Sequence, residues 1–551
     1  MQNFLSKTLR NAISSTSNNE KTAPKQAMWE LPPPNPPKSK NPPRILIIGA
    51  GSRGGSFGRA IYSSTNGCVA AVAEPIDFKR KAFGSKHIWG FEEPREGEEF
   101  TGWKEFIEWE LQRRERAKNG EEVPEGVDGV FVCTLDELHA EIITELAPLN
   151  LHVLCEKPLA GGLQDCLQIY KSLRPEGPAS PSPALFGVGH VLRYSPHNIL
   201  LRKLLLEDEA IGEIISIEHT EPVGWWHFSH SYVRGNWRKE STSAPSLLTK
   251  SCHDIDLIMW LLCSPPDGLD RPPHLPSKVT SSGSLLYFKP SRKPELAGNA
   301  TNCLSCPAEK ECQYSAKKIY YDLGLNSSIT SWPVNIVVPD IEECNSFEAA
   351  EKKLMQRLGE DYTAGMSQAD INSRSWYGRC VYEAGNDVCD DQTVTITWED
   401  ETLPETNAGG SHLGHKVRHA KTAVFHMVAF TEKICERRSR IYGTKGELET
   451  DSSIIKIYDF ASGETKTHRP HLAGGGHGGG DYGLARQFVL AIDAVKNHEM
   501  SVDEAQRTFV GCTLEDVIRS HAMVFAAEDA RKGSKVIDWA EWWDKEVGGS
   551  L

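Results

Sequence analysis

The chain has 551 residues, of which 39% are apolar and 25% charged, and its 61 basic and 75 acidic residues give a formal net charge of -14. A chain of this length exceeds what one hydrophobic core covers, so we expect two folded domains with tails and insertions. The acidic balance, without a long Lys/Arg stripe, argues against a nucleic-acid partner. No apolar run approaches the ~18 to 20 residues that a membrane span needs, so we predict a soluble protein without a membrane partner.

Residues 1–43 are expected to be a disordered tail and a Pro-rich linker, because residues 30–43 contain seven prolines. The tail combines Lys7 and Arg10 with four serines and has no acid before Glu20, which leaves a mitochondrial presequence open beside a plain disordered tail. The 14 cysteines, without a secretory signal, indicate reduced thiols. We therefore predict a cytoplasmic protein, with a mitochondrial location as the alternative.

Residues 44–190 alternate short apolar runs with amphipathic segments, which predicts a parallel, doubly wound sheet in an α/β domain. Residues 92–126 are highly charged and predict a solvated, partly helical insertion. The expected strands are 44–48, 68–73, 127–133, 152–155 and 184–189. One helix is expected directly after the first glycine-rich turn, and two further helices at 139–146 and 163–173.

Residues 191–540 carry longer β-type runs, which predict an α+β domain with a large, mostly antiparallel open sheet and insertions. The expected strands are 213–221, 278–288, 393–398, 422–429, 439–443 and 454–459. Helices that would cover one face are expected at 245–262, 482–496 and 502–532, and loops or insertions at 263–300, 334–372 and 400–420.

The turn after the first strand reads GAGSRG, which has the spacing GxGxxG. In this spacing the first glycine permits a tight turn, the second lets the backbone approach a pyrophosphate, and the third allows the helix to pack on the strand. Alone, this motif is a weak signal. The cofactor-binding residues that it predicts are Gly49, Gly51, Ser52, Arg53 and Gly54.

Glu74 ends the second strand, twenty residues after Gly54, where an acid can bind the ribose hydroxyls of a dinucleotide. A carboxylate there repels a 2'-phosphate, which favours NAD over NADP. Arg53, Lys79 and Arg80 lie near enough in sequence to keep NADP open as the alternative cofactor.

Two further motifs follow in order, CEKPL at Cys155–Leu159 and LLTKSCHDID at Leu247–Asp256. Together with the GAGSRG turn they resemble the Gfo/Idh/MocA family of glucose-fructose oxidoreductase, inositol dehydrogenase and their relatives, over residues 44–540. The resemblance implies a Rossmann domain, a larger open-sheet domain, a nicotinamide held between them, and sugars or polyols as substrates.

The same resemblance implies roles for individual residues. Lys157 and His253 would be catalytic, and residues at the ends of two strands would contact the cofactor. These cofactor-contacting residues are Thr134, His139, Glu156 and Lys157. Leu135 departs from the proline that the family commonly carries beside this turn.

Both catalytic assignments have a chemical rationale. Pro158 disfavours a helical conformation at Lys157 and places it at the carboxyl end of a strand, where ligands bind in such sheets. A partly desolvated lysine there could orient the substrate hydroxyl or act as a base, and His253 has the right chemistry to exchange the hydroxyl proton. Thr249 replaces the aspartate usual in the family and Lys250 follows it, which leaves an altered mechanism or an acidic substrate open.

An aromatic and basic cluster precedes the histidine helix. Aromatic faces and hydrogen-bond donors suit a sugar, although a well-packed loop would have the same composition. The residues assigned to substrate binding are Trp226, His230, Arg234, Trp237 and Lys250.

Cys303 and Cys306 form a CxxC motif, Cys312 follows closely, and Cys380 is a candidate fourth thiol from a distant segment. This spacing permits a tetrahedral zinc site that would pin a long insertion. Clustered cysteines can equally be free thiols, so no residue is assigned as a metal ligand.

We therefore predict an NAD(P)-dependent oxidoreductase that oxidises a secondary hydroxyl of a sugar, cyclitol or related polyol. The sequence leaves homo-oligomerisation open. Two other functions also remain open: a redox-assisted glycoside-cleaving enzyme that recycles NAD in place, and a non-catalytic regulator that binds the cofactor. Turnover without added NAD, with release of a sugar, would identify the glycoside-cleaving enzyme.

Overall fold

The computed structural model describes residues 34–177, 179–265, 271–403, 417–471 and 476–550. The proposed mitochondrial presequence lies outside these ranges. Within them, no helix is long and apolar enough to cross a membrane.

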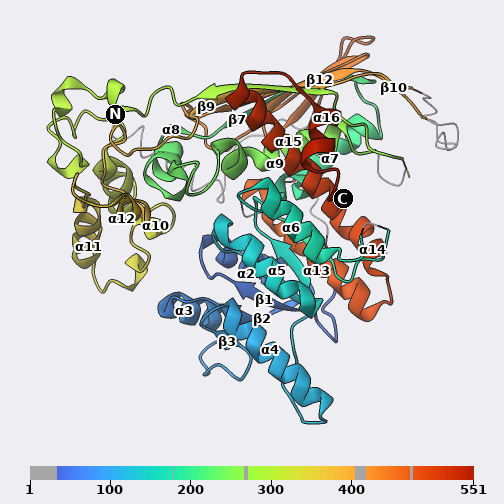
Figure 1. Cartoon of the computed structure of the whole chain (residues 1–551), viewed down its shortest axis with the longest axis horizontal. Helices are drawn as coiled ribbons and strands as arrows, with labels where there is room; N and C mark the ends of the chain where they lie inside the picture. Colours follow the sequence, from blue (N-terminus) through green and yellow to red (C-terminus); the bar gives the residue numbers. More distant parts are fainter. Residues whose placement is uncertain (1–33, 178, 266–270, 404–416, 472–475, 551) are drawn as a thin grey trace.

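The N-terminal part of the chain forms a six-stranded parallel sheet with the strand order β3-β2-β1-β4-β5-β6, which confirms the predicted doubly wound sheet (Figure 1). Its strands are β1 (Arg44–Ile48), β2 (Cys68–Ala73), β3 (Glu99–Phe100), β4 (Gly129–Val132), β5 (His152–Cys155) and β6 (Phe186–Val188). The apolar side chains of these strands are almost completely buried, as expected of a parallel sheet that is covered on both faces.

Helices connect these strands in the expected alternation. They are α2 (Ser52–Ser64), α3 (Asp77–His87), α4 (Trp103–Lys118), α5 (His139–Leu146) and α6 (Leu163–Leu173). The charged stretch 92–126, predicted to be a solvated, partly helical insertion, contains helix α4 and in addition supplies the edge strand β3 of the sheet. Its aromatic side chains explain the difference, because Phe106 is fully buried and its ring lies 5.4 Å from that of Phe100.

The second sheet has nine strands in the order β16-β15-β14-β13-β7-β12-β9-β8-β17. Only β7 and β12 pair in parallel among these neighbours, which confirms the predicted, mostly antiparallel sheet. Its strands are β7 (Ile214–Pro222), β8 (Lys278–Ser284), β9 (Asp391–Trp398), β12 (Lys421–Val428), β13 (Arg438–Gly443), β14 (Gly446–Thr450), β15 (Ile455–Asp459), β16 (Thr465–His468) and β17 (Ile537–Asp538). A separate two-stranded sheet contains β10 (Glu401–Thr402) and β11 (Val417–Arg418).

Buried helices pack against the large sheet, chiefly α9 and α15. Every residue of α9 is buried, so this helix lies in the interior rather than at the surface. The remaining helices of this part are α7 (Pro196–Leu206), α8 (Trp225–Phe228), α9 (Ser246–Leu262), α13 (Gly480–Asn497), α14 (Val502–Ala505), α15 (Leu514–Gly533) and α16 (Trp539–Glu546).

Residues 502–532 do not form the single helix that was predicted. After α14 and a π-helical turn (Gln506–Val510), Gly511 adopts a left-handed conformation with φ of 62°, which ends the helical segment. Thr513 and Asp516 then form a capping box that starts α15.

Helix α13, from the end of the chain, packs against α2 of the Rossmann domain. The ring of Phe488 on this helix lies 5.7 Å from that of Phe131 in β4. The core of the Rossmann sheet therefore includes a segment far outside residues 44–190.

Residues 285–390 form one large insertion between β8 and β9, seen beside the large sheet in Figure 1. It contains α10 (Val334–Val337), α11 (Phe347–Gly359) and α12 (Gln368–Asn372), so residues 334–372 are not only loops. The insertion has a small hydrophobic core of its own, in which Leu354, Tyr320 and Val337 are fully buried. Its amphipathic helix α11 starts at the capping residue Ser346.

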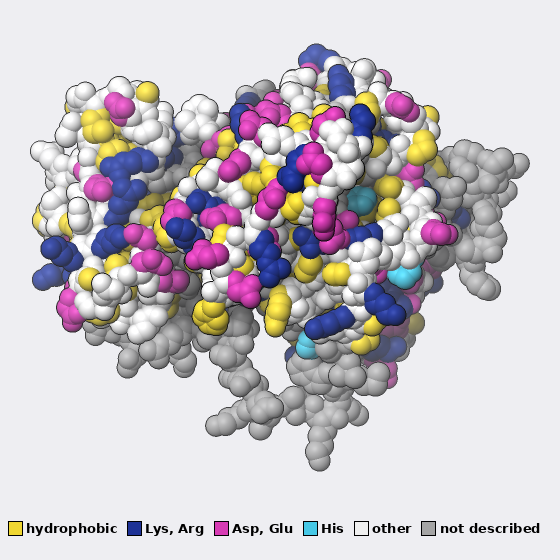
Figure 2. Space-filling model, turned by 90° about the horizontal axis from the view of Figure 1, so that it is seen from below, with side chains coloured by type: hydrophobic (Ala, Val, Ile, Leu, Met, Phe, Trp, Pro, Cys, Tyr) yellow, Lys and Arg dark blue, Asp and Glu magenta, His cyan; other side chains and the backbone are white. Residues whose placement is uncertain are grey.

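The molecular surface carries charges of both signs. On the face in Figure 2, Lys and Arg side chains lie among Asp and Glu side chains. This face therefore has no single-sign field of the kind that attracts nucleic acid.

Buried histidines predict a loss of stability in mild acid. Burial lowers the pKa of His521 from 6.5 to about 4 and that of His190 to about 3. Because these rings are neutral in the folded protein but titrate normally when unfolded, their stabilisation is present above about pH 6.5 and is lost as the pH falls toward their folded pKa. Each should cost on the order of 2 kcal/mol at about pH 5. Thermal unfolding followed between pH 7.5 and 5 should show a steep fall in Tm, and a flat profile would contradict it.

Candidate active site

The glycine-rich turn connects β1 to α2 at the carboxyl edge of the parallel sheet. Gly49 has φ of 94°, and a Cβ atom there would lie 2.6 Å from the carbonyl oxygen of Cys133. A Cβ on Gly54 would lie 2.0 Å from the carbonyl oxygen of Gly49. Neither position has room for a side chain, so both glycines are needed to bring the turn, the helix and β4 together.

The N-terminus of α2 is open. A Cβ on Gly51 would meet nothing within 4 Å, and the start of the helix has no side-chain cap. Ser52, the first helical residue, is exposed. The first backbone N–H groups of the helix therefore face free space, as an anion-binding helix N-terminus requires.

Glu74 lies beside this turn at the end of β2 and is only 6% exposed. Its Oε2 accepts a hydrogen bond from the backbone of Ala50 at 2.8 Å, and its Oε1 accepts one from Ile76 at 3.0 Å. The carboxylate is thus fixed directly next to the glycine-rich turn. Each oxygen keeps a second lone pair with which a hydroxyl donor could bond.

Arg53 is held by carboxylates rather than left free. Its guanidinium bonds Asp481 at 2.9 and 3.0 Å, and its Nε donates to Glu156 at 2.7 Å. Burial opposes the charge of Arg53, but these two carboxylates raise its pKa above the ordinary range. Because two carboxylates already pair with its guanidinium, Arg53 does not offer a free cation for a 2'-phosphate. It ties the glycine-rich helix to β5 and to α13 instead.

Lys157 follows β5 and reaches the second domain. Its Nζ donates a 2.6 Å hydrogen bond to the carbonyl oxygen of Thr249, which lies one helical turn before His253 on α9. His139 is fully buried and bonds the carbonyl oxygen of Pro158 at 2.8 Å through Nδ1. His139 therefore holds the turn that presents Lys157, which is a positioning role.

His253 is 1% exposed and lies among charged side chains. Its Nε2 is 2.6 Å from Nη2 of Arg437 and 3.3 Å from Oδ2 of Asp254, whereas its Nδ1 has no hydrogen-bond partner in the described part of the chain. Burial lowers the pKa of His253 well below its ordinary value, opposed by Asp254 and assisted by Arg437. The ring is thus neutral at physiological pH. Because the guanidinium of Arg437 can only donate, Nε2 accepts from it in this arrangement, and Nδ1, which has no partner among the described residues, carries the ring proton.

Lys250 is also buried and paired. Its Nζ lies 2.9 Å from Oε1 of Glu221 and 3.0 Å from Sγ of Cys435. Burial is the largest single effect and lowers its pKa, but Cys435, Glu221 and Tyr232 together outweigh it and raise the pKa overall. Glu221 lies 3.0 Å from Arg437 as well, so Lys250 and His253 belong to one buried charge network.

Trp237 lies near the carboxyl end of β4. Its Nε1 donates a 2.8 Å hydrogen bond to Oδ2 of Asp136, and its ring stacks on Tyr232. Burial raises the pKa of Asp136, while His139 and Lys157 lower it. Thr134, in the same turn, is half-buried. Trp237 is thus the aromatic residue of the predicted substrate set that lies closest to this edge of the Rossmann sheet.

The other three predicted substrate residues face the insertion. Trp226 is part of the insertion's hydrophobic core, with its ring 4.8 Å from that of Trp332. His230 bonds the hydroxyl of Tyr320 at 2.9 Å. Arg234 bonds backbone carbonyl oxygens within the same region. The structure does not bring these three side chains to Lys157.

Several residues of the site carried no sequence signal that we recognised. They are Asp136, Glu221, Cys435 and Arg437. Asp254 could have been found from the sequence, because it follows His253 directly in the motif. Its carboxylate lies 3.3 Å from Nε2 of that ring, in a chain that has Thr249 in place of the family's usual aspartate. The others come from distant strands and loops, whose convergence depends on the fold.

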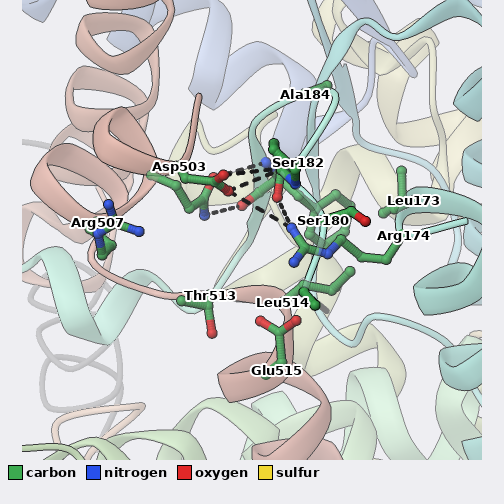
Figure 3. A pocket seen from close by; sticks show the side chains of 14 residues that line it. Leu173, Arg174, Ser180, Ser182, Ala184, Asp503, Arg507, Thr513, Leu514 and Glu515 are labelled. Atoms are coloured by element: carbon green, nitrogen blue, oxygen red, sulfur yellow. Dashed lines mark hydrogen bonds and ion pairs between the residues drawn. The ribbon is translucent and has the colours of Figure 1, made fainter. Parts of the chain in front are cut away.

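A separate pocket of about 380 Å³ lies between the end of α6 and the start of α15. Figure 3 shows Arg174 directed toward Ser182 and Asp503, with Arg507 turned away from them. Neither Lys157 nor the glycine-rich turn lines this pocket, so it is distinct from the site described above.

Part of the chain matches known oxidoreductases in sequence. Residues 43–178 match the profile of an oxidoreductase family with an NAD-binding Rossmann fold. The chain is 30% identical to 2,7-anhydro-N-acetylneuraminate hydratase of Escherichia coli over 141 residues, which are 26% of this chain and 35% of that protein. The matched stretch thus spans about a third of this relative. An oxidoreductase of Bacillus subtilis named YteT is 22% identical over 68% of this chain and 74% of its own length.

Among solved structures, the chain is similar to a levoglucosan dehydrogenase in complex with NADH and L-sorbose. The TM-score is 0.54 at 15% sequence identity, over 90% of this chain and 98% of that one. This likeness supports the two-domain fold.

Proposed function

We propose, because residues 43–178 match the Gfo/Idh/MocA family of NAD-binding oxidoreductases, that the chain is an NAD-dependent enzyme that oxidises a secondary hydroxyl of a sugar, cyclitol or related polyol. The observation that carries the proposal is the hydrogen bond from Lys157 to Thr249. It joins the cofactor edge of the Rossmann sheet to the helix that holds His253. A cytoplasmic location and homo-oligomerisation remain predictions from the sequence.

The residues present fit a dinucleotide. The uncapped N-terminus of α2 and the free space beside Gly51 suit a pyrophosphate. Glu74 is positioned to accept hydrogen bonds from the ribose, and the pairing of Arg53 with two carboxylates argues for NAD over NADP. When bound, the nicotinamide supplies the hydride acceptor.

Lys157 and His253 would act on the substrate hydroxyl. Lys157 keeps further N–H donors beyond the one bonded to Thr249, and these can bind and orient the hydroxyl oxygen. The unpartnered Nδ1 of His253 can accept the hydroxyl proton in the tautomer that carries the ring proton on Nε2. This tautomer requires that Nε2 donates to Asp254 rather than accepting from Arg437, and Asp254 then also stabilises the charged ring. Asp254 would thus compensate for the carboxylate missing at Thr249, whereas Arg437 keeps the resting ring neutral.

Replacement of Glu74 by alanine should weaken NAD binding by ~1 to 2 kcal/mol, because two hydrogen bonds from the ribose to a charged acceptor are lost. Titration calorimetry on the purified chain measures this. Since Glu74 also holds the backbone of Ala50, NADP affinity serves as the internal control. A loss of affinity confined to NAD supports recognition of the ribose by Glu74. Equal losses of affinity for both cofactors, or tighter binding of NADP than of NAD to the unmodified protein, would contradict it.

A second candidate is a redox-assisted enzyme that cleaves or hydrates an anhydro sugar or glycoside and regenerates NAD in place. It is favoured by the relative named as a hydratase, since hydration consumes no net oxidant. A screen of polyols and anhydro sugars separates the two candidates. Accumulation of reduced cofactor supports the dehydrogenase, whereas product formation at catalytic NAD without accumulation supports the second candidate. Inactivity with every compound, despite NAD binding, would favour a non-catalytic regulator.

A further inference from the structure

Four cysteines of the insertion line one small cavity. Cys303, Cys306, Cys312 and Cys380 surround a space of about 20 Å³, which has room for roughly one water-sized group. The cavity lies at the base of the insertion, where its first and last segments meet. All four cysteines are free thiols.

The backbone brings these thiols together. The N–H of Cys303 donates to the carbonyl of Gly378 at 2.8 Å, and the N–H of Cys380 donates to that of Thr301 at 2.8 Å. The isolated antiparallel bridge between Asn302 and Arg379 thus sets the CxxC segment beside the segment that contains Cys380. Cys306 and Cys312 are placed by short turns that continue from Cys303.

Arg234 projects into the same cavity and lacks a counter-ion. It is 1% exposed, donates to Cys303 Sγ at 3.5 Å, and has no hydrogen-bond partner at Nη1. In the described part of the chain, no carboxylate forms an ion pair with it within 4.0 Å, and Glu309, which lines the cavity, bonds Ser315 instead. A buried cation without an anion is strongly unfavourable. The guanidinium donates to the carbonyl oxygens of Arg379 and Tyr314, which carry no net charge. The thiol of Cys303 that it also faces would compensate its charge only as a thiolate.

We propose that Cys303, Cys306, Cys312 and Cys380 bind one zinc ion that fixes the insertion to the substrate domain. On binding, each thiol releases its proton to solvent and forms a Zn–S bond, and a four-thiolate site carries two net negative charges. Arg234 then donates to sulfur from outside the ligand shell and neutralises part of this charge. As they stand, no three or more His, Cys, Asp or Glu side chains of the described residues are arranged so that they could hold a metal ion. Closure of the site therefore requires that the thiols turn into the cavity.

A zinc ion here would have a structural role. Four protein ligands leave no open position for a substrate. The insertion core that the site would stabilise includes Trp226, the side chain next to His227, whose Nδ1 lies 3.7 Å from Sγ of Cys435 in the buried charge network. Loss of zinc would thus loosen the insertion first and the catalytic site only indirectly.

Metal analysis of the full-length protein, purified without chelator, tests the proposal. We expect about one zinc per chain, stoichiometric release when the thiols are titrated with a mercurial reagent, and a loss of most of the zinc in C306S and C312S. Cys344→Ser is the matched control, because Cys344 lies in the same insertion but not at the cavity, and it should retain the metal.

Three results would overturn the proposal: substoichiometric zinc in protein produced with zinc supplied, zinc retained in both C306S and C312S, or iron in place of zinc. If either variant fails to fold, the mercurial titration of the unmodified protein still shows whether thiols hold the zinc. These readouts do not depend on enzymatic activity, so the zinc site and the proposed oxidoreductase function can fail separately.

Discussion

Replacement of Lys157 by methionine is expected to lower kcat for oxidation of the substrate by ~10²- to 10⁴-fold, the range typical of general acid–base groups. Methionine keeps the length of the side chain but removes the ammonium group that binds the hydroxyl oxygen and bonds Thr249. NAD affinity should change little, because the pyrophosphate and ribose contacts lie at the glycine-rich turn. Steady-state kinetics and calorimetry on the same preparation measure both quantities.

Lys171→Met is a matched control for this variant, since Lys171 is exposed on α6. It should retain the activity of the unmodified protein. Near-normal turnover in Lys157→Met would show that Lys157 is not catalytic. Loss of NAD binding in this variant would show that Lys157 helps to bind the cofactor rather than to catalyse the reaction.

Replacement of His253 by alanine should lower kcat by a similar ~10²- to 10⁴-fold factor. It removes the free Nδ1 that exchanges the proton and leaves Arg437 with Asp254 and Glu221 as partners. His498→Ala, at an exposed position, is the control. Comparable kcat in both variants would contradict a catalytic role for His253.

The pH profile adds an independent check on His253. Burial and the Arg437 cation lower its pKa well below 6.5. As a base the ring is active when neutral, so kcat/KM should not fall as the pH is lowered through about 6.5 and should decrease only in more acidic solution. A fall centred near pH 6.5 that disappears in His253→Ala would show that the ring titrates as an ordinary histidine.

Local patterns predicted the fold well. The strands at 44–48, 68–73 and 152–155 and the helices at 139–146 and 163–173 have the predicted bounds, because their apolar spacing, glycines and prolines act within a few residues. The charged segment 92–126 is partly helical, as predicted, in α4. The edge strand β3 and the packing of Phe106 were not predicted, since their only signals are a few aromatic residues whose burial depends on the neighbouring strand.

The candidate site was predictable only where motifs mark it. Gly49, Lys157 and His253 each lie in a motif of fixed spacing, but Arg437 and Asp481 reach the site from segments about 180 and 430 residues from their partners. No local pattern predicts such a meeting. The misplacement of Trp226 and His230 has the same origin, since their composition suits a sugar site and an insertion core equally well.

A single-turnover experiment shows whether hydride transfer takes place at the site that Lys157 and His253 form. With the protein in excess over NAD and each polyol of the screen supplied in turn, absorbance of the reduced nicotinamide reports hydride transfer at this site. We predict that at least one sugar or cyclitol yields reduced cofactor with the unmodified protein and that Lys157→Met forms it ~10²- to 10⁴-fold more slowly. No reduction with any compound, although NAD binds, or equally fast reduction by Lys157→Met, would contradict this prediction.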